Sequence, residues 1–283
     1  MRAMDGNLYI SGSDNVIPAQ NCILVLDGSN GSSIAKTPPM DIGSFFTIDH
    51  SSIYYTRYGS LFESIRDETR YLILEKFDWQ TKKSIWKQGF GDSRSLVSWM
   101  EIVDGELYVK RLSDSYLFST EDGTILLHGE TSPYYYKKGI AYEVWDDLIA
   151  NKNGKEVWRT EFPAHMYGYP IFHGDSIFIR VGMELYIIDQ RSGKILWRSE
   201  NYNIISNIAV SSERIYFVTQ SGSLYSIGIK DKDIKTQAKF NEDGFFDAEH
   251  DNIAPEVAYD ERTKMVYVLL SKKGQLFAFQ ETK

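Results

Sequence analysis

Cysteine is almost absent from this sequence, because Cys22 is the single one among 283 residues. One thiol excludes an internal disulfide and any metal site built from several thiolates. Cys22 lies in the apolar run NCILVLD, so we expect it to be a small buried hydrophobic side chain. The five histidines are scattered along the chain, and His50 and His173 fall in predicted hairpin turns. The sequence therefore predicts no metal site.

Long hydrophobic runs are also missing. No stretch of about 18 apolar residues occurs, so no transmembrane helix is predicted. The N-terminal MRAMDGNLYISGSDN lacks the apolar core of a signal peptide. The chain as given is therefore expected in the cytoplasm, and a periplasmic or secreted location is the alternative if the N-terminus is incomplete.

The sequence has no excess of basic residues. It contains 31 Lys and Arg against 39 Asp and Glu, which gives a net charge of -8. This balance argues against nucleic acid or an anionic membrane as the main partner and suits a protein partner with a basic surface. The nucleophile elbow G-x-S-x-G, the Walker loop, H-E-x-x-H and Cys-x-x-Cys are absent. The sequence thus identifies no catalytic or cofactor-binding residue, and we expect a protein that is not an enzyme.

What the sequence does contain is an internal repeat. An aromatic residue stands in a short apolar run just after a turn at intervals of about 43 residues. A second and often a third apolar run follow each copy, and no helical period persists for about ten residues. The seven copies are centred on Tyr9, Tyr54, Tyr108, Ala141–Tyr142, Phe178, Tyr216 and Val266–Tyr267.

Four short strands repeated seven times are typical of a β-propeller, since one small sheet cannot bury both faces alone. The sequence therefore predicts an all-β, single-domain, seven-bladed β-propeller of four-stranded antiparallel blades, which we expect to be monomeric. Strands A to D of each blade run from the inside outwards, and the last blade lacks its outer strand. The predicted blades are approximately 1–39, 40–90, 91–130, 131–162, 163–200, 201–240 and 241–283.

The turn after the third strand has a preferred form, in which Asp, Gly and Trp are spaced four residues apart. Asp189, Gly193 and Trp197 carry the complete pattern, while Trp158 and Trp86 occupy the same place in other repeats. Asp can cap the turn, Gly permits a positive φ, and Trp buries a wide apolar area. We expect these tryptophans to dock one blade on another. A further indole, Trp79, lies in the polar segment FDWQTKK, where we expect its substitution to be nearly neutral.

This pattern resembles the pyrroloquinoline-quinone-type propeller repeat, roughly LYALDAKTGKELW. The quinone enzymes with this repeat use eight blades and hold the cofactor between a vicinal cysteine pair and a tryptophan, above a Ca²⁺ ion. The single cysteine here departs from that pattern, so no quinone is expected. The resemblance also covers non-enzymatic propellers such as the lipoprotein of the bacterial outer-membrane barrel assembly machinery, which binds a partner protein. It therefore implies a binding scaffold.

Function on a propeller concentrates in the loops that vary on the rigid frame. The D–A and B–C loops share one face, and here they are longer than the A–B turns. We expect a partner protein to bind this face, and the candidate contacts are Tyr58, Phe62, His165, Tyr167, Phe245, Phe246, Asp247 and Glu249.

Other interpretations of the same residues stay open. Each candidate side chain could pack locally, and Phe245 with Phe246 could plug the channel mouth. Binding of a small molecule or carbohydrate, or an enzyme that uses the central funnel, is the alternative function.

Overall fold

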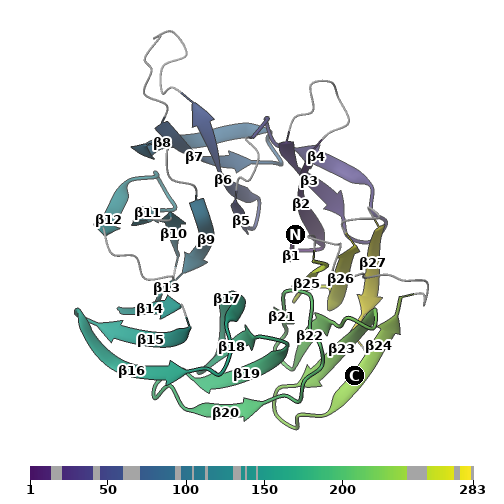
Figure 1. Cartoon of the computed structure of the whole chain (residues 1–283). Helices are drawn as coiled ribbons and strands as arrows, with labels where there is room; N and C mark the ends of the chain where they lie inside the picture. The colour runs from purple at the N-terminus through teal and green to yellow at the C-terminus, as the bar shows by residue number, and fades with distance from the viewer. Residues whose placement is uncertain are drawn as a thin grey trace. The chain divides into compact units, whose positions relative to one another are not determined.

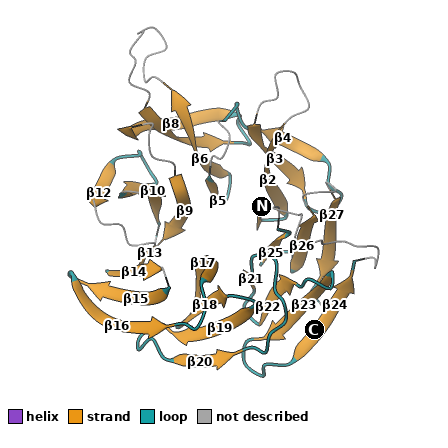
Figure 2. Ribbon diagram, viewed as in Figure 1, coloured by secondary structure: helices purple, strands orange, loops and turns teal. Residues whose placement is uncertain are grey.

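The computed structural model describes residues 1–13, 21–40, 45–59, 71–92, 97–103, 105–111, 114–129, 135–137, 139–144, 146–240, 254–270 and 275–281. Every regular element in these ranges is a β-strand, drawn in orange in Figure 2. Within the same ranges, no helix is long and apolar enough to cross a membrane. Seven antiparallel sheets follow one another along the chain, and this confirms the predicted fold class, an all-β seven-bladed β-propeller.

Contacts between residues divide the chain into two compact units. One contains residues 7–143 with Arg2, and the other contains residues 144–283 with Met1 and residues 3–6. The single domain predicted from the sequence stays a prediction.

The first three sheets each contain four strands, paired in sequence order (Figure 1). The first sheet contains β1 (Arg2–Met4), β2 (Asn7–Ser13), β3 (Asn21–Asp27) and β4 (Ser33–Lys36). The second contains β5 (Phe46–Asp49), β6 (Ser52–Gly59), β7 (Tyr71–Asp78) and β8 (Lys83–Asp92). The third contains β9 (Val97–Val103), β10 (Glu106–Arg111), β11 (Ser115–Ser119) and β12 (Ile125–Gly129).

The next three sheets repeat this order, and the seventh has three strands among the described residues. The fourth contains β13 (Tyr135–Lys137), β14 (Ile140–Val144), β15 (Asp147–Lys152) and β16 (Lys155–Glu161). The fifth contains β17 (Met166–His173), β18 (Ser176–Val181), β19 (Glu184–Asp189) and β20 (Ile195–Arg198). The sixth contains β21 (Ala209–Val210), β22 (Arg214–Val218), β23 (Ser223–Gly228) and β24 (Ile234–Lys239), and the seventh contains β25 (Glu256–Asp260), β26 (Met265–Leu270) and β27 (Gln275–Gln280).

The aromatic residues that reveal the repeat form the core. Tyr9, Tyr54, Tyr142, Phe178 and Tyr216 are 0% exposed, and the tyrosines of the other two repeats, Tyr108 and Tyr267, are 3% and 1% exposed. Strand β22, the second of its sheet, is buried at all five positions, whereas the outer strand β12 is exposed at four of five. Apolar area removed from water therefore concentrates on the inner and middle strands. Cys22 is buried in β3, as expected.

The N-terminal residues contact the last sheet. The Met1 amino group pairs with Glu256, the Gly6 amide donates to Asp260, and Arg262 donates to the Asp5 carbonyl. These bonds join the two ends of the chain within the second unit.

Candidate functional site

Most of the predicted partner-binding residues lie outside the described ranges. These are Phe62, Phe245, Phe246, Asp247 and Glu249. Tyr58 and Tyr167 belong to strands β6 and β17, respectively. His165 is the candidate whose side chain can be followed, and it lies just before β17.

We call the strand ends that carry the B–C turns and D–A connections the loop face. Within residues 144–283, His165 is a described residue of the loop face. Its carbonyl accepts a hydrogen bond from the Gly182 amide at 2.9 Å. The His165 ring lies 3.1 Å from Asp146, with the two side chains 66% and 85% exposed. So exposed a pair contributes little stability. The backbone bond, by contrast, fixes His165 beside the β18–β19 turn.

The connection between the fifth and sixth sheets, residues 200–208, is anchored along its length. The Ile205 amide donates to the Val218 carbonyl at 3.0 Å, and the Gln220 amide donates to the Asn203 carbonyl at 2.9 Å. The Ser206 hydroxyl accepts from the Val218 amide at 2.8 Å. These bonds satisfy backbone groups that a mobile loop would leave to water, so this part of the loop face is preformed.

Two polar side chains extend this anchoring. Arg180 donates to the carbonyl of Gly182 at 2.9 Å and to that of Ser206 at 3.1 Å, which ties the β18–β19 turn to the connection. The Asn207 amide donates to the Val257 carbonyl at 2.9 Å and accepts from the Val257 amide at 2.7 Å. It thereby pairs with β25 as a neighbouring strand would. Sequence reasoning missed both residues, because their partners are backbone groups that no motif displays.

The side chains exposed on this part of the loop face are mostly uncharged. Met183 is 45% exposed at the β18–β19 turn. Nearby, Glu184 accepts two bonds from Arg198 at 2.7 and 2.9 Å, and Arg198 holds the pKa of Glu184 below its usual value. Glu200, at the start of the connection, is exposed and charged. The other exposed residues of the connection and of the neighbouring turn carry amide or hydroxyl groups: Asn201, Asn203, Asn207, Gln220 and Ser221. A methionine surrounded by hydrogen-bonding groups is suited to contact with a protein surface.

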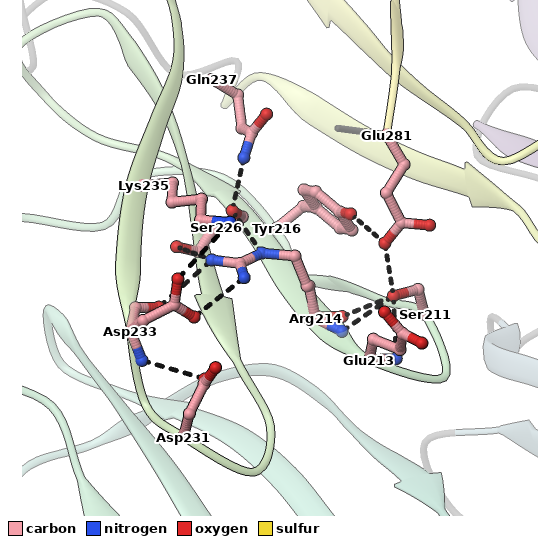
Figure 3. A network of polar contacts seen from close by, with 10 residues as sticks. All are labelled: Ser211, Glu213, Arg214, Tyr216, Ser226, Asp231, Asp233, Lys235, Gln237 and Glu281. Atoms are coloured by element: carbon pink, nitrogen blue, oxygen red, sulfur yellow. Dashed lines mark hydrogen bonds and ion pairs between the residues drawn. The ribbon is translucent and has the colours of Figure 1, made fainter. Parts of the chain in front are cut away.

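Figure 3 shows a second polar cluster, in the sixth sheet. Arg214 is 7% exposed and donates to the Ser226 hydroxyl and to the Asp233 carboxylate, both at 2.8 Å. It also donates to the carbonyls of Ser226 and Asp233 at 3.3 and 3.2 Å. Four of the five N–H donors of the guanidinium are therefore used within one sheet, which indicates a structural tie and leaves it little capacity to bind a ligand.

Glu281 ties the sixth and seventh sheets together in the same way. It accepts from the hydroxyls of Tyr216 at 2.5 Å, Tyr259 at 2.7 Å and Ser211 at 3.1 Å. Burial, and secondarily this carboxylate, raises the pKa of both tyrosines. The two rings stack with centroids 5.7 Å apart. This arrangement too stabilises the junction between two sheets.

The residues present do not fit a quinone cofactor. Cys22 is the single cysteine, is buried, and pairs with Gly12 inside the first sheet, so a vicinal pair cannot form. In the part of the chain that the structure describes, no three His, Cys, Asp or Glu side chains gather as metal ligands.

The repeat tryptophans contact the turn of the next sheet along the chain. Trp158 on β16 is 8% exposed, and its indole donates to the Gln190 carbonyl at 3.2 Å. A Cβ added at Gly193 in that turn would lie 2.5 Å from the Trp158 ring. Gly193 also has a φ of 71°, and Asp189 accepts from the Ser192 amide at 2.7 Å. The positive φ thus favours glycine in the turn, and the close approach of the indole requires it at position 193.

The same contact recurs elsewhere. Trp86 on β8 covers Gly123, where an added Cβ would lie 2.7 Å from its ring, and donates to the Thr120 carbonyl at 3.3 Å. Trp197 on β20 faces Lys232, whose ammonium lies 5.9 Å from the ring centroid and whose φ is 60°. The sequence links Asp, Gly and Trp within one repeat, but the packing joins the Trp of one repeat to the glycine position of the next.

Known proteins are similar to this chain in repeat type and fold. Residues 138–243 match the family model described as outer membrane protein assembly factor BamB. No curated protein matches the chain. Similar solved structures include the β-propeller domain of Cps50 (Swd1) from Myceliophteria thermophila, which is 7% identical with a TM-score of 0.68 and covers 100% of this chain and 99% of its own.

Two other solved structures are similar over nearly the whole chain. A chain of the mitotic checkpoint complex is 7% identical with a TM-score of 0.67, and the alignment covers 98% of this chain and 84% of that one. The computationally designed protein Ika8 is 9% identical with a TM-score of 0.63, over 98% of this chain and 81% of its own. At these identities the likeness shows the fold alone.

Proposed function

We propose that the chain is a non-catalytic scaffold that binds a partner protein through its loop face, because residues 138–243 match the BamB family model and the seven sheets form a β-propeller. The observation that carries the proposal is the anchored connection 200–208 together with the exposed Met183 beside it. A preformed surface loses little conformational entropy on binding, and that favours affinity.

The composition of this surface supports a protein partner. Its exposed amides and hydroxyls can bond to backbone and side-chain groups, while Met183 can adapt to an apolar neighbour. The net charge of -8 favours a partner with a basic surface through its effect on the rate of encounter. Phe62, Phe245 and Phe246 lie outside the described residues, so their part in binding stays a prediction.

The family match supports the same conclusion. The matched residues 138–243 include the fifth and sixth sheets, which contribute the anchored connection. The family model is named for an assembly factor, so the proposal of a scaffold role agrees with the name of the family.

The test compares two exposed positions on opposite ends of the same sheet. Met183→Asp alters the loop face, and Arg191→Ala alters the C–D turn, where the Arg191 side chain is 78% exposed. Both variants and the wild type serve as bait in quantitative affinity capture from the native host. We expect at least one protein whose recovery falls more than about tenfold with Met183→Asp alone, since an interfacial charge left unpaired costs about 1.4 kcal/mol or more. Equal recovery by all three baits would contradict the proposal.

A further inference from the structure

The outer strand of the third sheet, β12, exposes three consecutive aliphatic side chains. Ile125 is 42%, Leu126 50% and Leu127 54% exposed. The sheet order is β12-β11-β10-β9, so β12 is the terminal strand of its sheet. A terminal strand presents backbone N–H and C=O groups on which another strand can pair.

Charged side chains commonly prevent such an edge from pairing with another chain, and β12 contains no Lys, Arg, Asp or Glu. Lysine on an edge strand discourages pairing with another chain, because a new strand would have to desolvate the charge. The outer strands of the other four-stranded sheets each carry at least one basic residue: Lys36 on β4, Lys87 on β8, Arg159 on β16, Arg198 on β20 and Lys235 on β24. The terminal strand of the three-stranded seventh sheet, β27, has none either. The segment from Ser119 to Gly129 contains neither Lys nor Arg.

One side chain of β12 is also less buried than its counterpart in a related strand. Leu127 stands at the repeat position that Trp158 occupies in the fourth sheet, yet Leu127 is 54% exposed and Trp158 is 8% exposed. Each of these strands also has an irregular residue just before that position, Leu126 in β12 and Val157 in β16. Because this irregularity is shared, it does not set β12 apart. Its three consecutive exposed aliphatic side chains, together with the exposure of Leu127 at the position that corresponds to Trp158, do.

The two ends of β12 differ in charge. Glu121 and Asp122 are exposed in the turn that precedes it, and hydrogen bonds from Thr124 lower the pKa of Asp122 to about 2, so it stays ionised. At the other end the His128 ring stacks on Tyr116 with centroids 4.3 Å apart, which holds that end of the strand in place. A segment that pairs with β12 thus meets aliphatic side chains along its length and carboxylates at one end.

We propose that the β12 edge accepts an extended segment of a partner protein, rich in aliphatic residues and ending in lysine or arginine beside Glu121 and Asp122. Backbone hydrogen bonds along the edge supply affinity, and the apolar side chains and the carboxylates supply specificity. This inference rests on the proposed scaffold function, because it assumes a protein partner, but it uses a different surface from the loop face.

The probe is a labelled peptide of alternating valine and threonine that ends in two lysines, and a companion peptide ends in two glutamates. Antiparallel pairing places the C-terminal lysines beside Glu121 and Asp122. Binding is measured by fluorescence anisotropy, and hydrogen exchange is followed on residues 125–129. We expect slower exchange in those residues and at least tenfold weaker binding of the glutamate peptide at low salt.

Variants separate this edge from other apolar positions. Leu126→Lys combined with Leu127→Lys should weaken binding of the lysine peptide at least tenfold with little change in melting, since both side chains are already half exposed. Leu196→Lys is the matched control, at an irregular position of β20 that is 57% exposed, and it should leave binding unchanged.

Three outcomes would overturn the proposal. The first is an equal loss of binding with Leu196→Lys, and the second is no added protection of residues 125–129. The third is protection of those residues that rises with protein concentration without peptide, which would make a second copy of this chain the occupant. Met183→Asp alters the loop face and should leave peptide binding at β12 unchanged. The loop-face proposal can therefore fail in the capture experiment without affecting the result of the peptide experiment.

Discussion

Replacing Gly193 by alanine tests how one sheet docks on the next. Gly193 has a φ of 71°, where alanine costs about 1–2 kcal/mol in backbone strain. The new Cβ would also lie 2.5 Å from Trp158, and forcing an extra methyl into a packed contact costs about 1–3 kcal/mol. We therefore expect Gly193→Ala to lower the free energy of unfolding by about 2–5 kcal/mol, the sum of the two effects.

Gly154→Ala is the matched control. Gly154 has a φ of 72°, and nothing lies within 4 Å of its added Cβ, so only the backbone cost of about 1–2 kcal/mol should appear. Trp158→Ala alone should cost about 3–5 kcal/mol, as truncation of a buried tryptophan usually does. In the Trp158→Ala background, Gly193→Ala should keep its backbone cost and a tight contact with the Thr160 hydroxyl, 3.0 Å from the added Cβ, but lose the clash with the indole. This gives a coupling of about 1–3 kcal/mol.

The assay is urea denaturation followed by far-UV circular dichroism, which does not depend on the tryptophan that is removed. The stability changes come from the midpoint and the slope of each transition. Two results would refute the conclusion that Trp158 docks on Gly193. One is an equal loss of unfolding free energy for Gly193→Ala and Gly154→Ala, and the other is a Gly193→Ala effect that is unchanged in the Trp158→Ala background.

Three further predictions concern stability. Trp79→Ala should lower the free energy of unfolding by about 1–3 kcal/mol, because the indole packs edge-on against Tyr9 with ring centroids 6.5 Å apart. Trp79→Phe should lower it less, because it keeps a ring and removes a buried N–H that has no partner among the described residues. Equal stability losses for the two variants in urea denaturation would contradict this. Burial lowers the pKa of Lys110 to about 8, so the unfolded chain binds more protons between about pH 8 and 10. Stability should rise with pH in that window, by at most about 1.4 kcal/mol per pH unit, and melting curves of Lys110→Met should lack this rise. Because Arg198 lowers the pKa of Glu184, this ion pair stabilises the fold above about pH 4.3, and its contribution is lost as the pH falls through the folded pKa of Glu184. Acid titration should therefore reduce the melting temperature of Glu184→Gln less than that of the wild type.

The sequence was sufficient for the repeat because the repeat is a local pattern. Tyr54 and Tyr216 each stand in a short apolar run after a turn, and in the structure both are fully buried. A short continuous apolar run of this kind follows from the geometry of a strand that is covered on both faces, so it is visible without knowledge of the partner sheets.

The contacts between repeats could not be predicted with the same detail. Gly193 contacts Trp158, which belongs to the preceding repeat. The sequence pattern, by contrast, associates Gly193 only with Trp197 of its own repeat. The polar sequence neighbours of Trp79 predict that its substitution is nearly neutral, yet the indole packs on Tyr9 from the first sheet. The expected small effect of its substitution is therefore replaced by the stability loss predicted above.

The candidate site was the least predictable part. Arg180 and Asn207 bond to backbone carbonyls and amides, whose positions depend on the fold of the connection 200–208. The sequence instead favoured aromatic residues in long loops, of which Phe245 and Phe246 lie outside the described residues. Their role in binding, like that of Tyr58 and Tyr167, stays a prediction.

The most direct test of the scaffold function is site-specific photo-crosslinking in the native host. A photoreactive amino acid replaces Met183 on the loop face in one variant and Arg191 at the opposite end of the sheet in another; both positions are exposed. The scaffold function predicts a defined protein adduct from position 183 and none from position 191. Adducts of equal yield at both positions, or no protein adduct at position 183, would contradict it.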